Sequence, residues 1–252
     1  MKTTKRLFAF AMVVAVAGAR LVHALSPAVQ APVAPVVDAE RVRVYHARIA
    51  SGVARLAARP SLAQLLPLVL LGAGDGGSNE GIVDDHRAAL LALAFYVNNW
   101  PIEAMVPEAR GWPRAERRNT LLRGRHDLAQ HFTVSAVVSA FSGTAIANAV
   151  GLSKEMDDVR RASGFSFSDL AADRAGTLFG EMATTSSESA RRFQGRLASG
   201  LTEDDIMPAV VGLPDNLTRA EFTRRYGDVG SPAYTRLLDE IDRRIAALPL
   251  FH

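Results

Sequence analysis

Three short polar motifs lie close together in the middle of this chain of 252 residues. In order, they read HDLAQHF at 126–132, KEMDD at 154–158 and SDLAADRAG at 168–176. Side chains three or four residues apart lie on one face of a helix. If each motif is helical, its polar groups form one-turn pairs, which are Asp127 with His131, Glu155 with Asp158, and Asp169 with Asp173.

Three helices that each present one polar pair could converge on a single inward site. Imidazole and carboxylate groups are the ligands expected for zinc, manganese or magnesium, and a cluster without metal could do acid-base chemistry instead. The candidate metal ligands are His131, Glu155, Asp158, Asp169 and Asp173. The candidate catalytic groups are His131, Glu155, Asp158 and Asp173. A divalent metal is the one cofactor that these residues suggest.

The same residues also have ordinary structural interpretations. Ser166 and Asp169 have the spacing of a capping box, so Asp169 could simply close the start of a helix. Asp158 and Asp173 could pair with neighbouring arginines at the surface, where an ion pair contributes little free energy. The spacing leaves open whether these acids cap and solvate two helices or point inward together.

The three motifs, taken in order, resemble those of a known family. HDLAQHFTVSA, GLSKEMDD and GFSFSDLAADRAG are similar to segments of the YfiM-type family of bacterial envelope lipoproteins, and the similarity covers 126–181. The matching positions are His131, Lys154, Glu155, Asp158, Gly164, Ser166, Asp169, Asp173 and Gly176. The layout of His, Glu and Asp on successive helices is also similar, more distantly, to VanZ-like membrane proteins. The resemblance implies an envelope location and strengthens the polar site, but it implies no particular reaction.

The N-terminus has the features of an export signal. Three basic residues precede an apolar stretch at 7–19, and small residues suited to a signal peptidase follow it. Cleavage after Ala24 is preferred to cleavage after Ala19, because Pro27 follows closely. The apolar stretch is shorter than the about 20 residues of a spanning helix, which disfavours an uncleaved anchor. We therefore expect export to the periplasm or the cell surface.

Charge and cysteine content exclude several classes of protein. The net charge is +3, and residues 1–24 hold four basic groups and no acids, so cleavage leaves 3 − 4 = −1. Nucleic acid is not an expected partner for such a chain, since non-specific binding depends on neutralising phosphates. The chain has no cysteine, which excludes a disulfide framework, a thiolate metal site and the lipobox acylation typical of the resembling family.

The elements that must position the polar motifs are predicted to be helices, so the fold class is all-α. A single helical domain at 38–252 is expected to follow a signal peptide (1–24) and a Pro-rich linker (25–37). Its polar motif core is 126–181, and its C-terminal helices occupy 201–252. The spacing of apolar residues predicts earlier helices, which are 38–57, 61–71 and 84–96.

The longest uncharged run of the mature chain is 132–152, FTVSAVVSAFSGTAIANAVGL. Its length would allow a bilayer span, but its Ser, Thr, Gly and Asn residues make it weakly hydrophobic. Small residues suit close helix contacts. We therefore interpret it as a buried central helix of the domain rather than a spanning one.

Six arginines lie between 110 and 125. Such a run is usually a solvated face, but Arg also suits bidentate contact with an oxyanion, so the segment could clamp a phosphate or an acidic lipid.

Two functions of different classes follow from these patterns. The first is an exported envelope protein whose buried His/carboxylate cluster organises helix packing, with function carried by contact with a protein, a membrane surface, an envelope lipid or a glycan. The second is a metal-dependent hydrolase or phosphoesterase that acts on an envelope lipid or glycan. In that case the cluster would hold the metal, and the Arg-rich segment would hold the substrate anion.

Overall fold

The computed structural model describes residues 38–72, 81–142 and 164–252. Every regular element in these ranges is a helix, and the only β-type pairings found there are isolated bridges, so the all-α prediction is confirmed. The predicted signal peptide, the Pro-rich linker, Glu155 and Asp158 lie outside the described residues.

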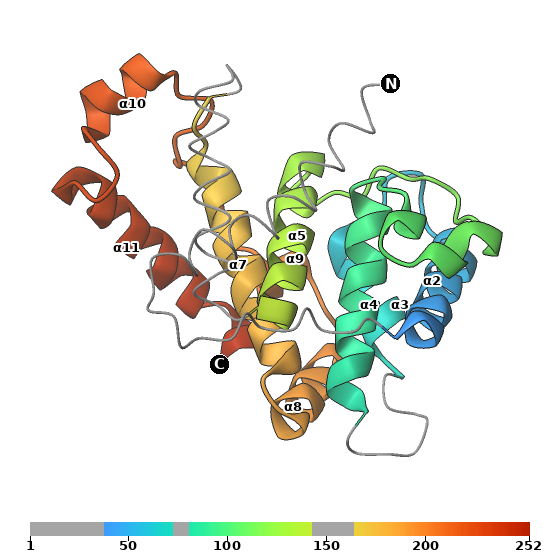
Figure 1. Ribbon diagram of the computed structural model, residues 1–252. Helices are drawn as coiled ribbons and strands as arrows, with labels where there is room; N and C mark the ends of the chain where they lie inside the picture. The colour runs from blue at the N-terminus through green and yellow to red at the C-terminus, as the bar shows by residue number, and fades with distance from the viewer. Residues whose placement is uncertain (1–37, 73–80, 143–163) are drawn as a thin grey trace, which may run out of the picture.

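Figure 1 shows the helices in their order along the chain. The longer ones are α2 (Ala39–Val53), α3 (Leu62–Leu70), α4 (Ile82–Val97), α5 (His126–Ser142), α7 (Phe167–Thr184), α8 (Ser187–Ala198), α10 (Arg219–Tyr226) and α11 (Pro232–Ala246). The shorter turns are η1 (Ile102–Ala104), η2 (Pro107–Gly111), α9 (Glu203–Ile206) and η3 (Pro249–Phe251).

Several helices begin at residues whose side chains cap the helix. Ser61 forms a capping box with Gln64 at the start of α3, and Thr218 does so with Glu221 at the start of α10. Ser231 caps α11, whose first residue is a proline. A side-chain oxygen at this position accepts a hydrogen bond from a backbone N–H that the helix itself leaves unpaired. The predicted helix at 38–57 ends earlier, at Val53, because the chain turns there before Pro60.

Helices α5 and α7 form the closest pair in the structure and run side by side through its centre (Figure 1). A Cβ atom at Gly176 would lie 2.2 Å from the carbonyl oxygen of Phe132, and one at Gly180 would lie 2.1 Å from that of Ala136. Two glycines one turn apart therefore let the backbone of α7 touch the backbone of α5. No larger residue fits at either position.

Other helices pack against this pair or against one another. Helix α4 packs on both α2 and α5, and α8 turns back against α4 and α7. At the start of α7 an aromatic cluster joins α7 to α10 and α11. Its members are Phe165, Phe167, Phe222, Tyr226 and Tyr234.

The long uncharged run begins inside this core. Phe132, Ala136 and Ala140 of α5 are buried, as expected for a central helix, while 143–152 lies outside the described residues. Across the part of the chain that the structure describes, no helix combines the length and the hydropathy required to cross a bilayer.

The glycine contact makes a sharp prediction about stability. Gly176→Ala places a methyl group against a backbone carbonyl that cannot move aside, so we expect the free energy of unfolding to fall by about 3 kcal/mol or more. Urea denaturation followed by circular dichroism measures this loss.

Gly195 is the matched control, because it is exposed on α8 and an added Cβ would meet nothing within 4 Å. Gly195→Ala should be neutral or should stabilise by about 0.5–1 kcal/mol through its better helix propensity. Equal effects of the two substitutions would contradict the close α5–α7 contact.

Candidate functional site

The imidazole of His131 lies between two carboxylates of α7. Its Nδ1 is 3.2 Å from both carboxylate oxygens of Asp173, and its Nε2 is 3.4 Å from Oδ2 of Asp169. Asp169 and Asp173 are one turn apart, which places both acids on the face of α7 that meets α5. Only a doubly protonated imidazole could donate to both carboxylates at once.

Asp173 is the most deeply buried acid of this group. Its side chain is 5% exposed, and Oδ1 accepts a hydrogen bond of 2.7 Å from the hydroxyl of Ser135 on α5. Burying a carboxylate at this depth without partners would greatly lower the stability of the folded state. The hydroxyl of Ser135 and the imidazole of His131 supply the compensating contacts.

Arg125 extends the cluster to the start of α5. Its guanidinium contacts Asp127 at 2.7 and 3.0 Å, Asp169 at 3.1 Å and Asp215 at 2.6 Å. The hydrogen bonds that Arg125 donates to Asp127, together with the other two carboxylates, raise the pKa of Arg125. One cation therefore joins α5, α7 and the loop that precedes α10.

Asp215 is held by the first turn of α7. It accepts hydrogen bonds from the hydroxyls of Ser166 and Ser168, at 2.7 and 2.9 Å, and from the backbone N–H of Ser168. Burial opposes its ionisation, but these hydrogen bonds and Arg125 outweigh burial and lower the pKa of Asp215. The same balance of burial against Arg125 lowers the pKa of Asp127.

The structure brings together three of the five predicted ligand residues, His131, Asp169 and Asp173. Glu155 and Asp158 lie outside the described residues, so their predicted place in the site stays a prediction. Asp127, predicted to pair with His131, reaches the cluster through Arg125 instead.

The structural alternatives for two of these acids are also resolved. Ser166 does cap α7, since its hydroxyl accepts from the backbone N–H of Asp169, but the carboxylate of Asp169 turns inward. A surface pair between Asp173 and Arg174 is wrong, because Asp173 is buried and Arg174 binds Asp242 on α11. The inward arrangement therefore holds for Asp169 and Asp173.

Three members of the cluster were not predicted from the sequence. Ser135 sits in an uncharged helix where a serine resembles any small residue, and Asp215 lies in a loop far along the chain. Arg125 belongs to the Arg-rich segment, and only its position immediately before the HDLAQHF motif set it apart. No local spacing rule connects these residues with α7.

The geometry is not that of an activated nucleophile. The hydroxyl of Ser135 donates to Asp173 rather than to an imidazole nitrogen, and the Nε2 of His131 faces a carboxylate. A catalytic triad requires the nucleophile to bond to the imidazole. Among the residues that the structure describes, no group of three or more His, Asp or Glu side chains has the arrangement needed to hold a metal ion.

Comparisons with protein-family models, with curated proteins and with solved structures find no match for this chain. The resemblance in 126–181 therefore stays a prediction. Within it, several motif positions have direct structural roles: Ser166 caps α7, Gly176 allows the helix contact, and Gly164 has a φ of +84° next to the backbone of Asn216.

His86 on α4 is a second buried histidine, and the sequence did not single it out. Its Nδ1 lies 2.7 Å from the carbonyl oxygen of Ala183, near the end of α7, and its ring packs edge-on against Phe193. Its Nε2 is buried and has no hydrogen-bond partner among the described residues. Burial lowers the pKa of His86, although the bond to Ala183 and the charge of Asp85 act in the opposite direction.

The cluster predicts strong coupling between His131 and Asp173. Replacing either residue by Ala leaves a buried charged or polar partner, so each single change should lower the free energy of unfolding by about 3–5 kcal/mol. The double variant should lose at least about 1 kcal/mol less than the sum of the two single losses. Arg174→Ala is the control on the same helix, and it should cost at most about 1 kcal/mol and add to His131→Ala. Additive losses for His131 and Asp173 would contradict a shared cluster.

His86 predicts a specific loss of stability in acid. Because its folded-state pKa lies below the ordinary value of 6.5, the unfolded chain takes up the proton first. The stability contributed by neutral His86 is therefore present above about pH 6.5 and is lost as the pH falls below it.

His86→Gln isolates this effect, since a glutamine amide can donate to the Ala183 carbonyl oxygen but does not titrate. Urea unfolding at about pH 7.5 and about pH 5.5 should show a larger acid-induced loss for the unmodified protein than for His86→Gln. Parallel pH dependences of the two proteins would show that His86 does not contribute.

Proposed function

We propose that this protein is a non-catalytic component of the bacterial envelope. It is exported through its N-terminal signal, and its buried polar cluster organises helix packing. Its function is carried by contact of the folded surface with a protein, lipid or glycan of the envelope.

One observation carries this proposal: the polar side chains of the cluster that the structure describes are directed at one another. Hydrogen bonds and ion pairs run from Ser135 through Asp173, His131, Asp169 and Arg125 to Asp215 without interruption. A substrate would have to displace these contacts and enter between α5 and α7, where the two backbones touch. The cavity described below lies elsewhere, against α2 and α4.

The export part of the proposal rests on the basic, apolar and small-residue segments at 1–24. We expect protein purified from the native host to begin close to Leu25 and to fractionate with the periplasm or the envelope. N-terminal sequencing of the mature chain and cell fractionation test this directly. Recovery of a cytosolic chain that retains Met1 would overturn it.

The hydrolase hypothesis predicts a different metal content and a different response to a chelator for the purified protein. If the cluster were a metal centre completed by Glu155 and Asp158, the purified protein would contain a stoichiometric divalent metal, and a chelator would lower its melting temperature. For an organising cluster we expect the melting temperature to stay the same after dialysis against a chelator. A chelator-sensitive melting temperature that becomes insensitive in Glu155→Ala would favour the hydrolase.

A further inference from the structure

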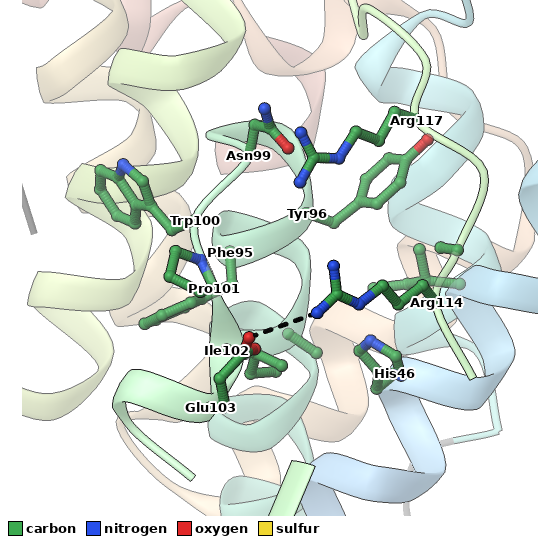
Figure 2. A pocket seen from close by; sticks show the side chains of 13 residues that line it. His46, Phe95, Tyr96, Asn99, Trp100, Pro101, Ile102, Glu103, Arg114 and Arg117 are labelled. Atoms are coloured by element: carbon green, nitrogen blue, oxygen red, sulfur yellow. Dashed lines mark ion pairs between the residues drawn. The ribbon is translucent and has the colours of Figure 1, made fainter. Parts of the chain in front are cut away.

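A cavity of about 370 Å³ opens on the side of α2 and α4 that is remote from the His131 cluster. Its walls are α2, the end of α4, η1 and the connection at 112–120 that follows η2 (Figure 2). This volume is at the lower end of the range found for small-molecule sites, which is about 300–1,000 Å³.

The inner wall of the cavity is apolar. Ile49 of α2, Phe95 of α4 and Ile102 of η1 line it and belong to the main hydrophobic core, so the wall is fixed by packing. The ring of Tyr96 forms another side, and its hydroxyl is held by the carbonyl oxygen of Glu116. The lower part of the cavity therefore suits the flat or short apolar body of a ligand.

The rim carries two arginines from the Arg-rich segment. Figure 2 shows the side chains of Arg114 and Arg117 reaching across the opening, Arg114 toward Glu103 and Arg117 toward Asn99. Arg114 is 83% exposed, and its ion pair with Glu103 is long, at 3.6 Å. No described residue forms a hydrogen bond or an ion pair with Arg117. Both guanidinium groups are thus available at little cost to an incoming anion.

Other arginines of this segment are committed to internal contacts. Arg118 donates to the carbonyl oxygen of Leu56, Arg123 binds Asp204 and the carbonyl oxygen of Met207, and Arg125 belongs to the polar cluster. The histidine at the cavity, His46, has a lowered pKa because of burial, despite the opposing charge of Glu103. The lining therefore carries two fixed positive charges against one negative charge.

From this combination of an apolar wall and a doubly cationic rim, we propose that the cavity binds a small organic anion. The ligand has a phosphate or carboxylate head, which accepts hydrogen bonds from Arg114 and Arg117, and an apolar body that packs on Ile49, Phe95 and Ile102. Guanidinium groups suit such heads because they can donate two parallel hydrogen bonds to one oxyanion. This site does not depend on the His131 cluster or on the proposed export.

Phenyl phosphate is a suitable probe, because it combines both features in a molecule of the right size. Trp100 lines the cavity and Trp112 packs against the ring of His46 at 5.4 Å, so tryptophan fluorescence should report binding. We expect saturable binding of phenyl phosphate, and clearly weaker binding of inorganic phosphate and of uncharged benzyl alcohol, because each of these lacks one half of the interaction.

Arg117→Gln and Arg110→Gln form a matched pair. Both residues are exposed arginines of the same segment, but Arg110 does not line the cavity. Arg117→Gln should weaken phenyl phosphate binding about tenfold through the loss of a charge-assisted hydrogen bond, while Arg110→Gln should change it by less than about twofold. Ala115→Phe, which places a ring at the cavity wall, should abolish binding without a change in the circular dichroism spectrum.

Equal effects of Arg117→Gln and Arg110→Gln would overturn the proposal, because they would show attraction by net charge alone. Equal affinity for benzyl alcohol would overturn it as well, since the anionic head would then be irrelevant. Binding to phosphatidylglycerol vesicles without saturable binding of phenyl phosphate would assign the arginines to a membrane surface instead of a small-molecule site.

Discussion

The close contact between the backbones of α5 and α7 is the constraint on which the rest of the structure depends. Gly176 and Gly180 allow this approach, because any side chain there would overlap a carbonyl oxygen of α5. The polar residues lie beside this contact between α5 and α7. Asp173 is one turn before Gly176 on α7. His131 comes directly before Phe132, and Gly176 faces the carbonyl oxygen of Phe132. The separation of the helices thus sets the distance between the imidazole and the carboxylates.

A polar cluster between two packed helices costs desolvation free energy that apolar residues would not cost, because its charges are removed from water. The structure offsets that cost with many contacts per group. Arg125 is shared by three carboxylates, and Asp215 is held both by Arg125 and by the first turn of α7. If α5 and α7 slid past each other, several of these hydrogen bonds and ion pairs would be lost at once. We therefore interpret the cluster as a set of contacts that fixes how α5 and α7 pair.

The chemistry-bearing residues of this chain fall into two separate places. His131, Asp169 and Asp173 are turned inward between α5 and α7, where they contact one another. The cavity at α2 and α4 has the opposite character, with an apolar wall and two arginines at its opening. The Arg-rich segment supplies both places, since Arg125 holds the cluster while Arg114 and Arg117 face the cavity. The sequence suggested a solvated face or an anion clamp for this segment; Arg125 has a structural role instead, and an anion clamp at Arg114 and Arg117 stays a prediction.

The sequence by itself determined the all-α class, several helix starts and the placing of Asp169 and Asp173 on one face of a helix, because these depend on interactions between residues a few positions apart. Capping boxes at Ser61 and Thr218 and the spacing of Asp169 and Asp173 are local signals of this kind. Only the tertiary structure decided which partners the start of α7 has, because Ser135, Arg125 and Asp215 differ by 38 to 49 in residue number from the residues that they contact there. The same holds for the contact of His86 on α4 with the end of α7. It holds also for the cavity, whose walls come from segments that share no sequence pattern and meet only when the hydrophobic core is packed.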